Sequence, residues 1–171
     1  MKIVILNASP RKEGNTSKAL QYLLERYKNE DITSFDLVDY DIEHCSGCLN
    51  CSKTGKCIFN DDMDIIYDAI DAAELLIFTT PVYFNSVTSI GKQVIDRFQR
   101  NYARRFILKS SLKVDANKKG ILLATAGSKE KNHEFDGLRK PIDLMFKANG
   151  IREYEIIIIE NADMNSIKNI F

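Results

Sequence analysis

Short apolar runs recur along the chain, and each has the length of one buried strand. The first, Lys2–Asn7, has a continuously apolar centre rich in β-branched residues. That pattern is typical of a strand covered on both faces, as in a parallel sheet. Runs of similar character predict four further strands, at residues 33–38, 74–79, 120–126 and 154–159.

Segments with helical spacing separate these runs. Asn15 or Thr16 is the expected cap of the first helix, because both side chains can accept a hydrogen bond from the first turn. The stripes that predict the helices are Ala19, Leu20, Leu23, Leu24 and Tyr27; Met63, Ile66, Tyr67 and Ile70; Ile90, Val94, Ile95 and Phe98; and Leu138, Ile142, Met145 and Phe146. The last helix is expected to stop at Asn149-Gly150. Residues 101–119 form one long, weakly periodic connection.

The alternation of strands and helices predicts the fold class. Right-handed crossovers join parallel strands into one sheet with helices on both faces, which is a doubly wound α/β architecture. No internal repeat or linker interrupts residues 1–171, so we expect one domain.

Charge and hydropathy exclude several function classes. Lys plus Arg and Asp plus Glu number 24 each, so no domain-wide positive field favours nucleic acid. Every apolar run is far shorter than the ~20 residues of a membrane helix. The N-terminus lacks the pattern of a secretory signal, so we expect a cytoplasmic protein with neither a membrane nor a nucleic-acid partner.

All four cysteines fall within residues 45–57. They follow the pattern Cys45-x2-Cys48-x2-Cys51-x5-Cys57. The repeated two-residue spacing lets one winding loop bring thiolates together, which suits a [4Fe–4S] cubane. Two alternatives stay open: a zinc site, which usually joins Cys pairs across a longer interval, and free thiols or a redox disulfide.

The loop after the first strand offers polar groups for an anion. Hydroxyl and amide groups precede a helix whose N-terminus has free N–H groups and a positive dipole end. These residues are Ser9, Asn15, Thr16 and Ser17, with Gly14 allowing close backbone approach. Arg11 adds a bidentate cation or points into solvent. A phosphate monoester fits this loop, although the Walker and dinucleotide patterns are absent. The alternative is that these residues only cap a helix.

Three segments together carry a resemblance. Residues 9–17 (SPRKEGNTS), residues 81–86 (PVYFNS) and Ile95-Asp96-Arg97 are similar to the flavodoxin-like NAD(P)H-dependent FMN reductase family. The cysteine segment resembles the iron-sulfur flavoprotein branch of that family. The resemblance implies a flavodoxin-like, five-stranded sheet with the strand order 2-1-3-4-5.

The resemblance also implies roles for individual residues. It assigns the FMN phosphate to Ser9, Arg11, Asn15, Thr16 and Ser17. It assigns the isoalloxazine ring to Pro81, Val82, Tyr83, Phe84, Asn85 and Ser86. A third wall is expected from Thr125 and Gly127, in the loop that ends at Ser128. Tyr83 and Arg97 are the side chains expected nearest the ring. The residues themselves support a flat apolar ring wall, although aromatic side chains at a strand end also serve as core.

The implied function is that of an FMN-dependent oxidoreductase. Electrons from NAD(P)H or another reduced donor would pass through FMN, and through a [4Fe–4S] cluster on Cys45, Cys48, Cys51 and Cys57, to a small acceptor or a redox carrier. The alternatives are a cluster-free FMN, quinone or nitro reductase and a non-enzymatic flavin electron carrier. The resemblance further implies a homodimer or homotetramer.

Overall fold

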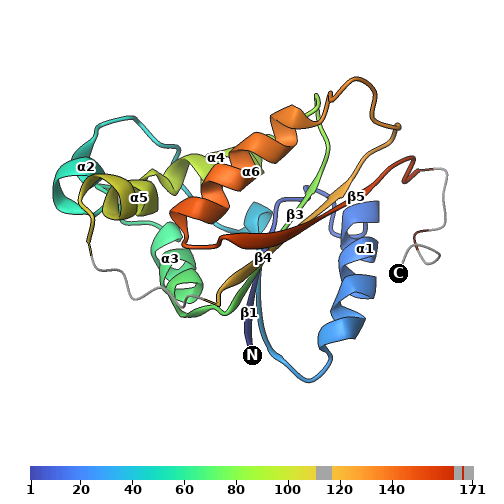
Figure 1. Cartoon of the computed structure of the whole chain (residues 1–171), viewed down its shortest axis with the longest axis horizontal. Coiled ribbons are helices and arrows are strands. Elements are labelled where there is room, and N and C mark those ends of the chain that lie inside the picture. The colour runs from blue at the N-terminus through green and yellow to red at the C-terminus, as the bar shows by residue number, and fades with distance from the viewer. Residues whose placement is uncertain (111–116, 164–166, 168–171) are drawn as a thin grey trace.

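The structure is a computed structural model that describes residues 1–110, 117–163 and 167. Parallel strands form one sheet in the order β2-β1-β3-β4-β5 (Figure 1). The strands are β1 (Lys2–Asn7), β2 (Asp31–Asp36), β3 (Leu75–Pro81), β4 (Lys119–Thr125) and β5 (Glu153–Ile159). The chain runs outward from β1 to β2 and then returns to the other side of β1. The predicted doubly wound fold and its strand order are therefore confirmed.

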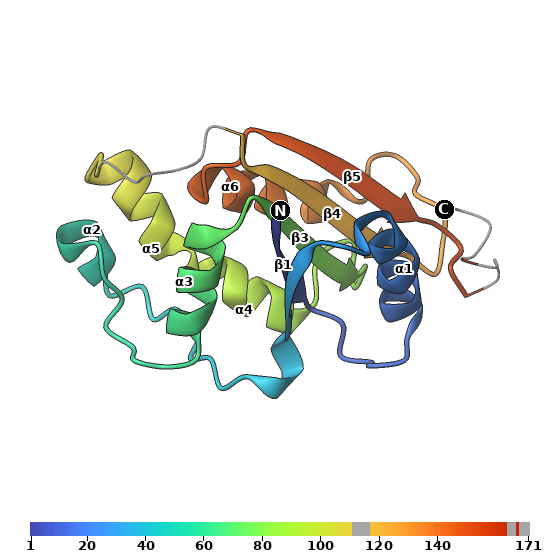
Figure 2. The ribbon, with the colours of Figure 1, turned by 90° about the horizontal axis from the view of Figure 1, so that it is seen from below.

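Helices cover both faces of the sheet. The α-helices are α1 (Asn15–Leu24), α2 (Asn50–Thr54), α3 (Met63–Ala72), α4 (Ser89–Arg97), α5 (Gln99–Tyr102) and α6 (Asp136–Ala148). Two 3-10 helices, η1 (Glu25–Tyr27) and η2 (Leu37–Asp39), and a π-helix, η3 (Ala103–Ile107), complete the described elements. Helices α2 and α5 lie together at the end of the molecule away from α1 (Figure 2). No helix in the described ranges has the length and apolarity needed to cross a bilayer.

The side-chain alternation of buried strands divides the core into two layers. Leu76 and Phe78 of β3 pack in the layer that contains α3, α4 and α6. Leu75 and Ile77 of the same strand pack in the layer that contains α1. Because both faces are buried, β3 reads as a continuous apolar run rather than an alternating one.

Strand β2 differs most from its predicted bounds. It spans Asp31–Asp36 rather than 33–38, and Leu37 begins η2 with its side chain in the core. Strand β1 pairs with β2 from Lys2↔Asp31 to Asn7↔Asp36. Pairing with β1 therefore sets the ends of β2. The apolar pattern of β2 alone does not determine them.

The predicted cap of α1 is wrong. Gly14 is the N-cap residue, and no side chain accepts a hydrogen bond there. Asn15 and Thr16 lie inside the first turn, and their side chains bond instead to residues after β5 and to Thr125. Tertiary partners therefore take the polar groups that would otherwise cap the helix.

The predicted connection at residues 101–119 begins as helix. It starts within α5, continues through η3 and ends in β4, while residues 111–116 lie outside the described ranges. The buried side chain of Asn101 donates to Asn149 Oδ1 at 2.6 Å, which ties α5 to the end of α6. A contact between segments so far apart in the chain cannot be read from local periodicity.

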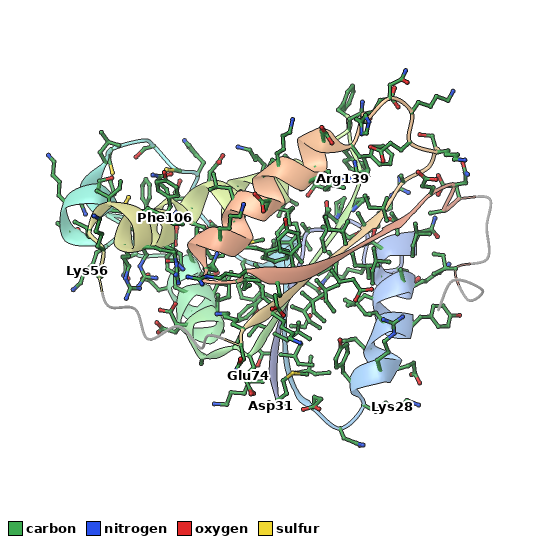
Figure 3. The ribbon with its side chains drawn as sticks, viewed as in Figure 1. Lys28, Asp31, Lys56, Glu74, Phe106 and Arg139 are labelled. Carbon is green, nitrogen blue, oxygen red and sulfur yellow. The ribbon has the colours of Figure 1, made fainter. Side chains whose placement is uncertain are left out.

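Glu130 anchors the loop that leads from β4 into α6. Its carboxylate accepts hydrogen bonds from Arg139, which projects from α6 (Figure 3), and from the backbone N–H of Phe135. Above all, the Arg139 bonds lower the pKa of Glu130 from 4.5 to about 2. A carboxyl group with a depressed pKa stabilises the fold above its unfolded pKa, and this contribution is lost as the pH falls through the folded value. We expect the urea midpoint to fall between pH 4.5 and about 2, and Glu130→Gln to remove that part of the decline.

The matched control is Glu134→Gln, in the same loop. We expect Glu134→Gln to keep the part of the decline that Glu130 produces, because the substitution leaves the bonds between Glu130 and Arg139 in place. Parallel urea titrations from pH 6 to pH 2 compare the three proteins. Identical slopes for wild type and Glu130→Gln would contradict the prediction.

Candidate functional site

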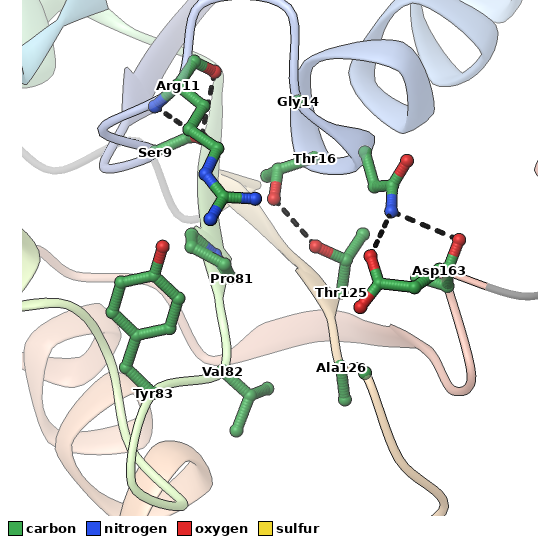
Figure 4. Close-up of a pocket in the computed structure, with 13 residues that line it drawn as sticks. Ser9, Arg11, Gly14, Thr16, Pro81, Val82, Tyr83, Thr125, Ala126 and Asp163 are labelled. Atoms are coloured by element: carbon green, nitrogen blue, oxygen red, sulfur yellow. Dashed lines mark hydrogen bonds between the residues drawn. The ribbon is translucent and has the colours of Figure 1, made fainter.

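Three loops meet at the carboxyl ends of β1, β3 and β4, on the edge of the sheet where ligands of doubly wound folds bind. Together with residues that follow β5, they enclose a cavity of about 260 Å³. Its walls are Ser9, Arg11, Gly14, Asn15 and Thr16; Pro81, Val82 and Tyr83; Thr125, Ala126 and Gly127; and Ala162 and Asp163 (Figure 4). Most residues expected at a phosphate and ring site thus surround one space.

Asn7 shapes the first loop from the end of β1. Its side-chain oxygen accepts hydrogen bonds from Thr79 Oγ1 at 2.8 Å and from the backbone N–H of Ser9 at 3.2 Å. Its amide nitrogen donates to Asp36 at 2.7 Å. One buried amide therefore connects β1, β2 and β3 and fixes the position at which the loop leaves the sheet.

The start of α1 points at the cavity with unpaired donors. Within the described residues, the backbone N–H groups of Asn15, Thr16 and Ser17 have no hydrogen-bond acceptor. The hydroxyl of Thr16 is 2.6 Å from Thr125 Oγ1, which joins the first turn of α1 to the end of β4. Free N–H groups and the positive end of the helix dipole together favour an anion.

Charged side chains of opposite sign line this cavity. Arg11 extends its guanidinium between Thr16 and Tyr83 (Figure 4). Across the cavity, Asp163 Oδ1 accepts a hydrogen bond from Asn15 Nδ2 at 2.8 Å. The sign of the field at this end of α1 therefore depends on the Asp163 carboxylate as well as on the helix.

The second loop forms a tight turn beside the cavity. Tyr83 and Ser86 exchange backbone hydrogen bonds, and the two residues between them, Phe84 and Asn85, have positive φ angles. The hydroxyl of Ser86 donates to the Gly137 carbonyl at 2.9 Å.

Proline explains why that carbonyl is free. Pro141 lies four residues after Gly137 in α6 and has no N–H to donate to it. A Cβ at Gly137 would also lie 2.9 Å from the Asn85 carbonyl oxygen. Helix α6 therefore holds the turn in place and presents Tyr83 to the cavity.

Several expected ring and phosphate residues lie outside the lining. Ser17 donates to the Arg11 carbonyl, and Asn85 and Ser86 support the turn through α6. Phe84 is fully exposed at the tip of the turn. For Arg97 the expectation of a place near the ring is wrong, because its buried side chain lies beside the cysteine segment.

Sequence reasoning missed the wall that follows β5. The backbone N–H of Ala162 donates to the Ala126 carbonyl, and that of Ala126 donates to Ile159, so the chain turns back toward the cavity. A Cβ on Gly127 would lie 3.0 Å from Asp163 Oδ2. These residues lie just beyond the carboxyl end of a predicted strand, where ligands of this fold class bind. Their position in the sequence could therefore have identified them as lining residues.

The cysteine segment winds around a second, smaller cavity of about 30 Å³. Its lining includes Cys45, Cys48, Cys51 and Cys57. Cys45 and Cys48 are exposed, whereas Cys51, on α2, and Cys57 are half-buried and all are free thiols. Burial raises the pKa of the Cys51 thiol, so the thiol is protonated at neutral pH unless a metal replaces its proton.

Positive φ angles make the winding of this segment feasible. Gly47 and Gly55 have φ angles of 68° and 72°. The side-chain amide of Asn50 donates to Thr54 and to the Lys56 carbonyl, which closes the turn after α2. No group of His, Cys, Asp or Glu side chains in the described ranges is arranged to hold a single metal ion.

A buried ion pair between Arg97 and Asp61 lies beside the cysteine cavity, whose lining includes Arg97. Arg97 bonds to both carboxylate oxygens of Asp61, and its Nη1 also donates to the Glu43 carbonyl at 2.7 Å. Burial raises the pKa of Asp61, but the hydrogen bonds from Arg97 and from two backbone N–H groups lower it by more. The net pKa therefore lies below its usual value. Removing one partner of such a pair costs about 3–5 kcal/mol.

Comparisons with known proteins agree on one family. The family model described as NADPH-dependent FMN reductase matches residues 1–159. An iron-sulfur flavoprotein of Clostridioides difficile is 45% identical over 102 residues, covering 57% of this chain and 45% of the relative. An iron-sulfur flavoprotein of Methanosarcina thermophila is 32% identical over 137 residues, covering 78% and 68%. The chain spans about half the length of the first of these relatives.

A solved structure gives the same fold. The FMN-dependent NADH-azoreductase of Bacillus anthracis, determined in complex with FMN, superimposes with a TM-score of 0.67 at 16% identity. The match covers 99% of this chain and 92% of the azoreductase. At that identity the likeness shows a shared fold.

Proposed function

The chain belongs to the NADPH-dependent FMN reductase family, and from this premise we propose that it is an FMN-dependent oxidoreductase of the iron-sulfur flavoprotein kind. The observation that carries the proposal is the cavity at the start of α1, where unpaired backbone donors and Arg11 meet at the carboxyl edge of the sheet. Such a site suits a phosphate monoester attached to a larger ring system.

The proposed division of the cavity follows its chemistry. The first turn of α1, with Ser9, binds the phosphate, and Arg11 adds a charge-assisted bond. Pro81, Val82 and Tyr83 supply a half-exposed apolar wall for the isoalloxazine ring, and the third loop limits the space opposite. When bound, FMN supplies hydride acceptance at N5 and electron donation to a second substrate.

The residues leave room for that second substrate. The cavity of about 260 Å³ is slightly smaller than the ~300–1,000 Å³ typical of ligand pockets, so part of the ring would stay accessible. NAD(P)H as donor and a small molecule or redox carrier as acceptor would use the accessible part. A homodimer or homotetramer would cover more of it, and this is the assembly we propose.

We further propose that the four cysteines bind a [4Fe–4S] cluster, which supplies one-electron transfer. A cubane binds each thiolate through a different iron, so its ligands need not converge on one point as they do around a single ion. Four thiols on one cavity match that donor set. Because the cavity is only about 30 Å³, binding would displace the exposed part of the segment around Cys48.

Free thiols also fit a reducing compartment such as the cytoplasm.

A spectrum tests the proposed function. Protein purified without oxygen is mixed with excess FMN, desalted, and analysed for visible absorption and iron, and then NADPH or NADH is added in a stopped-flow instrument. We expect bound flavin, stoichiometric iron and bleaching of the flavin by one of the two nucleotides. Flavin without iron would favour the cluster-free reductase, and bound flavin that neither nucleotide bleaches would favour an electron carrier. Failure to bind FMN would overturn the proposal.

A further inference from the structure

Arg97 is the most deeply buried cationic side chain beside the thiols. It is the last residue of α4, only 2% exposed, and it lines the cysteine cavity together with Arg100 and Phe59. Its guanidinium carbon lies 5.2 Å from the centre of the Phe59 ring. A charge in this position is retained only with partners for its donors.

The partners that the structure provides do not use all its donors. A guanidinium has five N–H groups in a fixed planar fork. Three are bonded: Nη1 donates to Asp61 and to the Glu43 carbonyl, and Nη2 donates to Asp61 at 3.0 Å. Nε is buried with no acceptor among the described residues. The remaining hydrogen on Nη2 lies parallel to Nε–H, so one whole edge of the group has no partner.

Asp61 keeps that edge in a fixed orientation. Its carboxylate also accepts the backbone N–H groups of Glu43, at 2.9 Å, and Met63, at 3.1 Å. The carboxylate and the Glu43 carbonyl therefore hold the guanidinium from one side. A buried N–H without an acceptor is costly, and an oriented one is typical of a site that binds an acceptor.

We propose that the free edge of Arg97 donates hydrogen bonds to sulfur at the cysteine site, either a cysteine thiolate or an inorganic sulfide of the cluster. The inference rests on the cluster proposed above. Sulfur is the acceptor chemistry that the cavity concentrates, because four of its lining residues are cysteines. Arg97 thereby acts as a positioning residue for the cluster and as a control on its reduction potential.

The direction of the effect follows from charge. Reduction adds one electron to the cluster, and the external reductant supplies it. Arg97 neither gains nor loses a proton. Hydrogen bonds to sulfur stabilise the more negative, reduced form, so they raise the reduction potential.

The test compares Arg97→Lys with Arg100→Lys in the holoprotein. Lysine keeps the positive charge opposite Asp61 but lacks the two-donor edge. Arg100 lines the same cavity, lies over the Tyr67 ring and serves as the matched control. We expect Arg97→Lys to lower the equilibrium constant for cluster reduction about tenfold, which is ~59 mV for a one-electron couple. Arg100→Lys should change it much less.

Redox titration followed by electron paramagnetic resonance gives the potential, and iron analysis gives cluster content. Equal potentials for wild type and Arg97→Lys at equal iron content would overturn the inference while leaving the cluster in place. A wild-type protein that binds no iron would overturn the cluster proposal, and this inference with it.

A measurement on the unaltered chain covers the case in which Arg97→Lys does not fold. Protein containing ¹⁵N-labelled arginine is reduced, and pulsed electron paramagnetic resonance records nitrogen couplings to the cluster. We expect a ¹⁵N coupling that persists in Arg100→Lys. Absence of any ¹⁵N-arginine coupling in the wild-type holoprotein would overturn the inference.

Discussion

Cys48→Ala is expected to abolish iron binding and to leave FMN content almost unchanged. A cubane needs four thiolates, and this substitution leaves three in the cysteine segment. The cavity that we propose for FMN is lined by different segments, after β1, β3, β4 and β5, and its lining includes no cysteine. Because the two proposed cofactor sites are built from separate segments, a substitution in one should remove its cofactor without removing the other.

Iron and flavin are measured on the same anaerobic preparation after reconstitution with both. Ser52→Ala, a change on α2 at a residue outside the lining of the cysteine cavity, is the matched control and should keep wild-type iron content. Retention of full iron content by Cys48→Ala would mean that Cys48 is not a ligand. Equal loss of flavin and iron would show that the two sites are not independent.

The second large effect concerns charge at the start of α1. We expect Asn15→Asp to weaken FMN binding about 100-fold, which is ~2.7 kcal/mol. The substitution keeps the shape of the side chain but replaces the amide donor by a carboxylate beside the unpaired N–H groups of the first turn. The new carboxylate also faces Asp163, whose Oδ1 lies 2.8 Å from Asn15 Nδ2. A phosphate dianion would then meet two negative groups instead of one.

Asp163→Asn is the companion variant, with an effect in the opposite direction. It removes the carboxylate from the cavity wall and should strengthen FMN binding several-fold. The dissociation constant should also rise more steeply with salt, because salt screens an attraction that Asp163 no longer offsets. Quenching of flavin fluorescence at two ionic strengths measures both variants. If Asn15→Asp binds FMN as tightly as wild type does, the phosphate does not occupy the start of α1.

The apolar runs predicted the type and order of the main elements, because helix and strand spacings are local properties of the chain. The cysteine spacing and the polar loop after β1 are local in the same sense. The bounds of β2, by contrast, depend on pairing with β1, and the cap of α1 depends on partners more than 100 residues away, at Thr125 and Asp163. Contacts of that range leave no periodic trace in the sequence.

The sequence by itself therefore determined the doubly wound α/β fold, the thiol set and the polar loop after β1 in which we propose that the phosphate binds. Only the tertiary structure decided that Asp163 lines the cavity at the start of α1 and that Arg97 lines the cysteine cavity instead. The physical reason is that backbone bonds between β4 and the chain after β5 fix the position of Asp163, and the bond to Asp61 fixes that of Arg97. Both depend on which distant segments meet once the sheet has formed, and residue spacing does not specify that.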